Sequence, residues 1–578
     1  MFDLKIVGGT IVDGRGGPAF VGDVAITDGR IAAIGPAVAG DAAETIDATG
    51  LLVTPGFVDI HTHYDGQATW DPVLEPSASH GVTTIVAGNC GVGFAPVHPG
   101  DESMLIEMME GVEDIPGTAL YEGIQWEWET FPQYLDALDR RSFSMDIAAY
   151  IPHAALRMYV MGARGATAES ATPEEVAEMA RHVRDAVAAG AVGVSTSRSL
   201  NHKTLDGELV AGTFADYQEL VGLARAVEEA GGGVFEVVPT GETGDDPDLI
   251  LGEIETMCRI AREVDVEVSV LVIQPSIAPD IYKRQLELIE KARADGARIH
   301  AQVAARAGGM LIGLASYHAF MRRPTFRALE DRLSYDELLV ELRKPEVKAA
   351  ILSEPDGPPD PTRQYQTLTE RMPFMLQRLF PIGDDPDYEP RPDQSVAAVA
   401  AATGTDPMEI LYDSMANGEL LLGAFTNYAD QNHDALAEMI QHPDTVMGLS
   451  DGGAHVRIIC DASAPTTLLT HWVRDRTRGP KLPLELVVRK QTFDTARAMG
   501  LHDRGSLEVG KKADVNVIDH AGLRLRGPRS VDDLPAGGRR ILQDAEGYVA
   551  TIVNGIVTRR HDHDTGARPG RLVRANAR

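Results

Sequence analysis

Residues 53–65, VTPGFVDIHTHYD, constrain this chain most, because they end an apolar run with two histidines spaced two positions apart. Side chains alternate between the two faces of a β-strand, so His61 and His63 are expected on the same face. Two neutral imidazoles at a strand end can form half of a site for a first-row metal, and zinc is the metal expected there. A half-buried strand that ends in two polar residues is the alternative, so other parts of the chain must supply the remaining ligands.

Eight apolar, strand-like segments recur along the middle of the chain. They cover residues 53–61, 81–88, 145–151, 192–197, 232–238, 266–274, 298–303 and 445–451. Amphipathic helical patterns with acidic starts and glycine stops lie between several of them. This alternation predicts an α/β fold built on a parallel (β/α)8 TIM barrel, with its chemistry at the carboxyl ends of the strands. His61 and His63 lie at such an end.

The two ends of the chain share a different pattern. Short alternating segments with glycine turns occur in residues 1–54 and again in residues 505–560. We therefore predict a small β-sandwich domain built from both termini, with the barrel of residues 55–504 inserted between them. Within the barrel, a stretch at about 304–444 that is rich in Pro, Asp and Arg predicts a long insertion of unassigned role. The polar tail, 561–578, is expected to be poorly ordered.

The composition excludes several kinds of partner. The formal net charge of −33 argues against nucleic acid and against an anionic membrane surface. The first residues read as strand and turn rather than a targeting segment, and no apolar run has transmembrane length. Three scattered cysteines are too few for a disulfide framework. We expect a cytoplasmic protein that acts on a small molecule, and a homo-oligomer is compatible with this sequence.

Two further positions are candidates to complete the site. Cys90 follows the second predicted strand in VAGNCGVGFAP, and Asp451 ends the eighth in GLSDGGAH. In a glycine-rich turn at a strand end, Cys90 is a candidate thiolate ligand, although a single cysteine is often a buried core residue. Once the barrel closes, Asp451 lies beside the first strand, where it could bind a metal or accept a proton from a metal-activated water. A turn or N-cap aspartate is the alternative.

Taken together, PGFVDIHTHYD, GVTTIVAGNCGVGFAP, GLSDGGAH and DRGSLEVGKKADVNVID resemble the amidohydrolase superfamily, and within it the N-acyl-D-amino-acid deacylase (D-aminoacylase) branch. The resemblance covers nearly the whole chain except residues 304–444. It implies that His61, His63 and Cys90 are metal ligands and that Asp451 is the catalytic acid/base. It also implies substrate-binding roles for two residues of the segment IPHAALRMYVMG, namely His153 and Arg157.

The chain departs from this branch after the fifth and sixth strands, where VFEVVPTGE and VLVIQPS lack the two usual histidines. Near the first gap, Glu236 is either an oxygen ligand or a buried, hydrogen-bonded barrel residue. Near the second gap, Gln274 is expected to bind substrate rather than metal. The sequence therefore favours one Zn²⁺ ion over two. Asp451 is preferred as a base rather than a ligand, because a catalytic metal needs an open coordination position.

Four residues on predicted loops are further candidates. His202 could bind metal or substrate, and His455 could orient Asp451 or bind substrate. Arg198 and Arg457 could each pair with a substrate carboxylate. For all four, an ordinary position on a surface loop is the alternative. A second His-x-His motif, at 561–563, has no apolar strand before it and is predicted to lie at the surface.

The predicted reaction is the hydrolysis of an amide-like bond. The metal would polarise the carbonyl and activate water, and Asp451 would transfer the water proton to the leaving amine. His153, Arg157 or His202 would stabilise the developing oxyanion. The first interpretation is an N-acyl-amino-acid deacylase. The missing histidines and the long insertion favour a second, an amidohydrolase acting on a cyclic amide, a lactone or another ester or amide. A non-catalytic descendant is disfavoured, and stereochemistry is not predicted.

Overall fold

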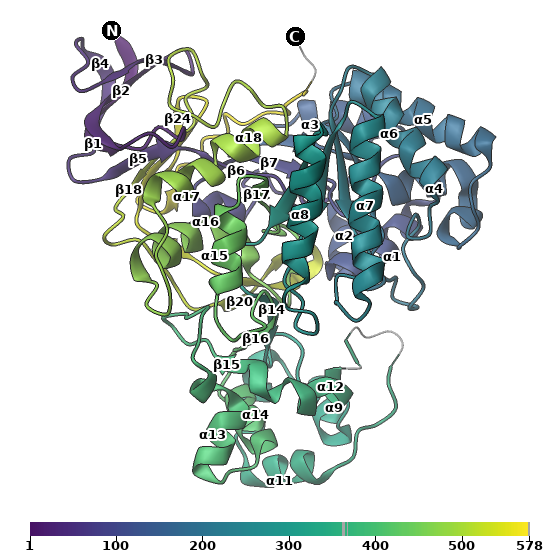
Figure 1. The fold of residues 1–578 in the computed structure, drawn as a ribbon. Coiled ribbons are helices and arrows are strands. Elements are labelled where there is room, and N and C mark those ends of the chain that lie inside the picture. The colour runs from purple at the N-terminus through teal and green to yellow at the C-terminus, as the bar shows by residue number, and fades with distance from the viewer. Residues whose placement is uncertain (361–364, 367, 576–578) are drawn as a thin grey trace.

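A computed structural model describes residues 1–360, 365–366 and 368–575. The fold is α/β, with parallel strands flanked by helices and a separate mixed sheet (Figure 1). The parallel strands are β6 (Phe57–Asp59), β7 (Val82–Ala87), β8 (Asp146–Ala149), β9 (Ile151–Pro152), β10 (Gly193–Ser197), β11 (Val234–Val238), β12 (Glu267–Leu271), β13 (Ile299–Val303) and β17 (Thr445–Met447). Each of the eight predicted strand segments therefore contains at least one strand.

Hydrogen bonding divides these strands into two parallel sheets, in the orders β6-β7-β8 and β9-β10-β11-β12-β13-β17. The Val192 amide donates to the Ala149 carbonyl at 2.9 Å and so links the two sheets on one side. On the other side, Thr62 forms an isolated parallel bridge with Gly452. Among the described residues the ladders do not form one continuous eight-stranded ring, but the strand order and direction follow the prediction.

Helices with one apolar face cover these strands. They include α5 (Pro173–Ala188), α6 (Tyr217–Glu229), α7 (Pro247–Glu263), α8 (Ile281–Ala294) and α15 (Asp434–Gln441). The start of α5 is set by a capping box, because the Thr172 hydroxyl accepts the Glu175 N–H while the Glu175 carboxylate accepts the Thr172 N–H. Helices of this kind alternate with the strands and place the strand ends at one face of the molecule.

Strands from both ends of the chain share one nine-stranded sheet. The N-terminal part contributes β1 (Phe2–Ile11), β2 (Phe20–Thr27), β3 (Arg30–Gly35), β4 (Ala42–Asp47) and β5 (Leu52–Pro55), and the C-terminal part contributes β18 (Val515–Ile518), β23 (Tyr548–Val553), β24 (Ile556–Arg560) and β25 (His563–Asp564). The two parts join where β5 pairs antiparallel with β18. Figure 1 shows the purple N-terminal strands beside the yellow C-terminal ones. The sheet has its own apolar core.

Residues 304–444 include a lobe with a separate hydrophobic core, seen at the bottom of Figure 1. Its sheet consists of β14 (Gly308–Ile312), β15 (Leu379–Pro381) and β16 (Leu421–Thr426), and its helices are α9 (Pro324–Glu330), α10 (Tyr335–Leu342), α11 (Pro345–Ser353), α12 (Leu368–Met375), α13 (Val396–Thr403) and α14 (Pro407–Ala416). The insertion is therefore a folded unit that begins immediately after β13, at the strand ends that carry the candidate site.

The C-terminal segment differs from the expectation of a poorly ordered tail. The Val573 amide donates to the Ile147 carbonyl at 2.7 Å, and Leu572 is buried. The segment is held because its backbone pairs with β8, a contact that its polar composition does not indicate. His561 and His563 are exposed, as predicted. No helix in the described part of the chain is long and apolar enough to cross a membrane.

A buried ion-pair network ties β8 to the terminal sheet. Asp146 is fully buried and accepts hydrogen bonds from Arg504 at 2.8 Å, from Lys512 at 2.6 Å and from the side-chain amide of Asn554 at 3.0 Å. Burial alone would raise the pKa of Asp146, but the two cations hold it below its usual value. Removing one partner of a buried pair is strongly destabilising, because the other charge stays buried without compensation.

We expect Asp146→Ala to lower the free energy of unfolding by about 3–5 kcal/mol. The control is Asp139→Ala, which removes a half-exposed carboxylate 3.2 Å from Arg574 and should cost no more than about 1 kcal/mol. Urea denaturation of the two variants measures the difference. Equal losses of stability would show that the network does not link the two parts of the molecule.

Candidate metal centre

Four of the predicted side chains meet at the carboxyl ends of three strands. His61 and His63 follow β6, Cys90 follows β7 and Asp451 follows β17. One ligand atom each from His61, His63 and Cys90 lies within 4.8 Å of the other two. The His61 Nε2 atom is 3.3 Å from the Cys90 Sγ and 3.3 Å from the Asp451 Oδ1, which lies 3.7 Å from the His63 Nε2. This is the juxtaposition that the strand-end argument predicts.

Tight turns hold two of these side chains in place. Cys90 and Asp451 adopt left-handed backbone conformations, with φ of 56° and 48°. Such conformations are uncommon for residues other than glycine and cluster at functional sites. The glycine after Cys90 is required by packing, because a Cβ on Gly91 would lie 2.9 Å from the Ser197 nitrogen. The turn after β7 can therefore approach β10 closely only with glycine at this position.

Hydrogen bonding fixes which nitrogen of His61 faces the site. The Nδ1 atom lies 2.9 Å from the Gln302 Oε1, and the amide nitrogen of Gln302 donates to the Ser269 hydroxyl at 2.8 Å. With Gln302 accepting through oxygen, the His61 proton is on Nδ1, and the Nε2 lone pair points at Cys90 and Asp451. Metal-binding histidines commonly donate the other ring N–H to an oxygen acceptor in this way.

Two buried carboxylates adjoin the cluster. Glu113 is 1% exposed and Glu236 is 0% exposed. Among the described residues neither carboxylate has a hydrogen-bond partner of good geometry. The contacts with the histidines are long, at 3.5 Å between Glu113 and the His63 Nδ1 and 4.0 Å between Glu236 and the His61 Nδ1, and the Cys90 backbone N–H also faces Glu236. Burial raises the pKa of both carboxyls well above the usual range, and the charge of Asp451 adds to the effect.

The side chains of this cluster fit a divalent cation. Buried, unpaired carboxylates are costly unless a cation compensates them, and two imidazoles with a thiol match the ligands that zinc selects. Burial lowers the pKa of His61 and His63, so their lone pairs are not taken up by protons at neutral pH. Burial raises the pKa of Cys90 well above its usual value, so its thiolate needs a nearby cation. These residues could therefore hold a metal ion.

Asp451 is an ionised carboxylate at the edge of the cluster. Burial opposes its ionisation, but the pKa of Asp451 lies below the ordinary aspartate range, because His61, His63 and His455 surround its carboxylate. Its side chain is 19% exposed, whereas those of His61 and His63 are at most 1% exposed. Asp451 therefore stays ionised and faces the open side of the cluster.

Two loop histidines also reach the cluster. The His455 Nε2 atom is 3.4 Å from the Glu113 Oε2, and the His455 N–H donates to the Glu113 carbonyl. His202 bonds through Nδ1 to the Ser197 hydroxyl at 2.8 Å. Burial, together with the nearby His455 and His63, lowers the pKa of His202 to about 3. His202 is therefore a neutral imidazole next to the metal-binding side chains.

The structure does not bring His153 and Arg157 to this cluster. The two ring nitrogens of His153 bond to the Thr196 hydroxyl at 2.8 Å and the Glu219 carboxylate at 2.9 Å. Arg157 donates to the same carboxylate at 2.9 Å and to the Gly165 carbonyl at 2.9 Å. Both side chains are almost fully buried. Their polar groups are used inside the protein, which disfavours the predicted contacts with substrate.

Two other predicted substrate-binding residues are also paired elsewhere. Arg198 donates to Glu253 on α7 at 2.6 Å and to the Ala215 carbonyl at 2.7 Å. The Gln274 amide oxygen accepts the Ala429 N–H at 3.1 Å, and its amide nitrogen donates to Asp430 at 3.3 Å. Gln274 thus connects the end of β12 to the insertion. Neither the Arg198 side chain nor the Gln274 side chain is available to substrate in this structure.

Arg457 differs from these residues. Its Nε is buried and has no hydrogen-bond partner among the described residues, and its guanidinium lies 4.8 Å from the centre of the Tyr317 ring. It lines a cavity of about 380 Å³ together with Asp114, Tyr317 and His318. Asp114 directly follows Glu113, and Arg457 is two residues beyond His455, so this cavity lies next to the cluster.

Sequence reasoning missed Glu113 and Gln302. Glu113 is the last residue of α1 (Glu102–Glu113), which ends because Asp114 adopts a left-handed conformation with φ of 50°. Gln302 is one of the alternating residues of β13. Its position one residue before the end of a barrel strand was the available signal. No sequence signal indicated Glu113, because it lies on α1, which is not a barrel strand.

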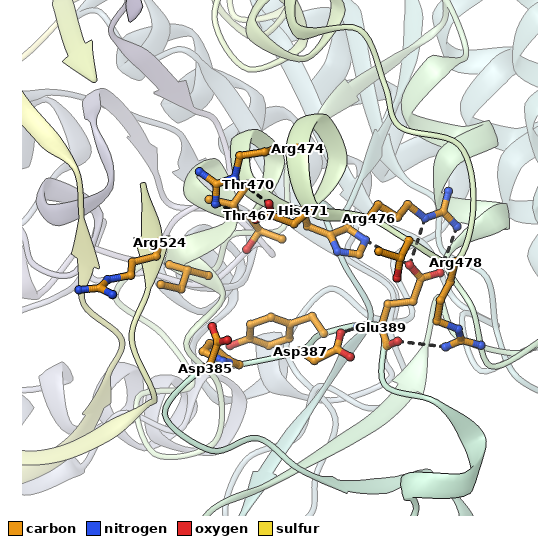
Figure 2. Close-up of a pocket in the computed structure, with 15 residues that line it drawn as sticks. Asp385, Asp387, Glu389, Thr467, Thr470, His471, Arg474, Arg476, Arg478 and Arg524 are labelled. Atoms are coloured by element: carbon orange, nitrogen blue, oxygen red, sulfur yellow. Dashed lines mark hydrogen bonds and ion pairs between the residues drawn. The ribbon is translucent and has the colours of Figure 1, made fainter. Parts of the chain in front are cut away.

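Glu389, His433 and His471 form a second cluster of potential ligands. Glu389 and His471 also line a cavity of about 310 Å³, shown in Figure 2. Here the charges are already paired. Arg476 donates to both Glu389 oxygens at 3.0 Å, as the dashed lines in Figure 2 show. The His433 Nε2 accepts the Ala307 N–H at 3.3 Å, so its proton is on Nδ1, the nitrogen that faces His471. We therefore assign no metal to this cluster.

Comparisons with known proteins agree with the motifs. The D-aminoacylase of Alcaligenes xylosoxydans xylosoxydans is 26% identical over 578 residues, which cover 100% of this chain and 98% of that protein. The N-acyl-D-glutamate deacylase of the same organism is 27% identical, over 89% of this chain and 87% of that protein. The solved N-acyl-D-glutamate deacylase of Bordetella bronchiseptica, complexed with zinc and a phosphonate inhibitor, has a TM-score of 0.65, with 25% identity and 99% of each chain covered.

A model of the family described as the Amidohydrolase family matches residues 44–559, which is most of the chain. The match includes the strand ends that carry His61, His63, Cys90 and Asp451, and it extends into the C-terminal part of the nine-stranded sheet. The relationship expected from the sequence motifs is therefore confirmed: the chain belongs to the amidohydrolase family.

Proposed function

We propose that this amidohydrolase is a metal-dependent deacylase that hydrolyses the amide bond of N-acyl amino acids. The observation that carries the proposal is the meeting of His61, His63, Cys90 and Asp451 at the strand ends. The two sheets of parallel strands are taken to act as one barrel, because chemistry in such folds is located at the carboxyl ends of the strands. The named relatives, a D-aminoacylase and an N-acyl-D-glutamate deacylase, support a substrate of this class.

Each residue has a defined role in the proposed reaction. His61, His63 and Cys90 would hold one zinc ion, which supplies Lewis-acid chemistry that polarises a carbonyl and makes water more acidic. Asp451 accepts a proton from the attacking water and then donates it to the leaving nitrogen. His202, a neutral imidazole near the cluster, would donate a hydrogen bond to the developing oxyanion. Glu236, whose Oε1 lies 4.0 Å from the His61 Nδ1, would be a further oxygen ligand for the metal.

A substrate panel tests the proposal. The purified zinc-loaded protein is offered N-acetyl derivatives of D- and L-amino acids, hydantoins and lactones, and release of free amine or acid is measured. We expect the N-acyl amino acids to be hydrolysed fastest. Faster turnover of cyclic amides or lactones would support the alternative function, which rests on the absent histidines after β11 and β12. A protein that turned over none of these compounds would contradict both the proposed and the alternative function.

Arg457 is the proposed contact for the substrate carboxylate. Its Nε has no hydrogen-bond partner in the part of the chain that the structure describes, and the guanidinium lies over Tyr317 beside the cluster. Guanidinium groups bind carboxylates through two parallel hydrogen bonds, which gives both strength and orientation. Arg198, the other arginine considered from the sequence, already binds Glu253.

We expect Arg457→Met to raise KM roughly 10- to 100-fold, which corresponds to the loss of a hydrogen bond between charged groups. The matched control uses a substrate in which the carboxylate is replaced by a carboxamide. With that substrate the variant and the wild-type protein should have similar KM values. If Arg457→Met impaired both substrates equally, Arg457 would not be the carboxylate contact.

A further inference from the structure

Glu113 is in an unusual position for a buried carboxylate. It lies between two histidines, with Oε1 3.5 Å from the His63 Nδ1 and Oε2 3.4 Å from the His455 Nε2. It is 1% exposed, and neither oxygen has a hydrogen-bond partner of good geometry in the described part of the chain. A carboxylate in such surroundings costs stability. Its presence at the cluster therefore calls for a functional reason.

His61 provides the comparison. Its Nδ1 faces the Gln302 oxygen and its Nε2 faces Cys90 and Asp451. His63 repeats this arrangement, because its Nδ1 faces Glu113 and its Nε2 faces Asp451 at 3.7 Å. In both histidines one ring nitrogen meets an oxygen acceptor and the other points into the cluster.

We propose that Glu113 is a positioning residue that tunes His63 for metal binding. The carboxylate accepts the His63 Nδ1 proton, which leaves the Nε2 lone pair free for the metal and makes that nitrogen more basic. Its second oxygen holds His455, whose backbone N–H is also tied to the Glu113 carbonyl. Glu113 thus connects the end of α1 to the loop after β17. The inference depends on the metal centre proposed above.

The test measures zinc affinity by competition with a chromophoric chelator. Glu113→Gln keeps an acceptor oxygen but removes its charge, whereas Glu113→Leu removes both. We expect about a 10-fold weaker zinc Kd for the glutamine variant and about a 100-fold weaker Kd for the leucine variant. The number of zinc ions bound should not change. Cobalt loaded in place of zinc should keep the charge-transfer band of the Cys90 thiolate.

Thermal unfolding of the metal-free proteins separates positioning from a structural role. If Glu113 serves the metal, metal-free Glu113→Gln should melt at the same temperature as the wild-type protein or higher, because glutamine keeps the shape of the side chain and removes a buried acid without a hydrogen-bond partner of good geometry among the described residues. The control is Glu107→Gln, an exposed glutamate on the same helix, which should keep the wild-type zinc Kd.

Three outcomes would overturn the assignment of Glu113. They are zinc Kd values within twofold of wild type in both variants, the loss of a bound zinc equivalent, which would make Glu113 a ligand, and a lower melting temperature of the metal-free glutamine variant. A wild-type protein that bound no zinc in the same titration would instead refute the metal-dependent function. The two failures are therefore distinguishable in one experiment.

Discussion

Replacing Asp451 with asparagine should reduce kcat by on the order of 10²- to 10⁴-fold, the range that general acid–base catalysis contributes. Asparagine has nearly the same shape but cannot take up the water proton. Although burial opposes ionisation, the pKa of Asp451 lies below the ordinary aspartate range, so the wild-type side chain is a carboxylate with an oxygen that can take that proton. Steady-state kinetics on the best substrate of the panel measures the loss.

The metal content of the same variant distinguishes the two roles that the sequence left open. If Asp451 is a base outside the coordination shell, Asp451→Asn should retain its bound zinc. Asp451→Glu, which keeps a carboxylate but moves it, should lose less activity than the asparagine variant. Near-normal turnover of Asp451→Asn would remove this residue from the chemistry, and loss of zinc would make it a ligand.

Removing the metal with a chelator should abolish turnover, and one equivalent of zinc should restore it. The physical reason is the charge of the cluster. Cys90, Glu113, Glu236 and Asp451 are all acidic groups at or beside two neutral imidazoles, and without a cation they cannot polarise a carbonyl. Zinc should also stabilise the fold, by about 4 kcal/mol when its free concentration is 1,000 times the Kd. Activity, zinc content and melting temperature are measured together.

A pair of cysteine variants provides the matched control. Cys90→Ala should lose high-affinity zinc binding and should not recover activity when zinc is added. Cys258→Ala removes another buried cysteine, on α7, whose thiol donates to the Leu288 carbonyl at 3.7 Å and lies in the hydrophobic core. It should behave like the wild-type protein in zinc binding. Full activity after complete metal removal, or zinc rescue of Cys90→Ala, would contradict the proposed centre.

The part of the candidate centre that depends on local backbone geometry could be predicted from the sequence. A period of two along a strand sets the faces of His61 and His63, and parallel strands bring their carboxyl ends to one edge. Those two rules were sufficient to place Cys90 and Asp451 beside the histidines. They also predicted the strand segments of the parallel sheets, because buried parallel strands appear as short apolar runs.

The sequence did not indicate which polar side chains satisfy one another inside the protein. His153 and Arg157 were expected at the substrate, but both are bonded to Glu219, a residue 62 or more positions away. Gln274 connects to Asp430 across the insertion. Such pairs depend on distances between helices and loops that have no periodic signature along the chain.

The sequence alone therefore determined the family, the strand order and the four side chains that follow directly from strand ends. Only the tertiary structure showed that Glu113 and Gln302 face the Nδ1 atoms of the two histidines and that residues 571–573 pair with β8. It also showed that the Arg457 Nε has no hydrogen-bond partner among the described residues. The physical reason is that the first group depends on backbone geometry repeated within a few residues. The second depends on packing, which brings together groups separated by hundreds of positions and decides which buried charges find partners.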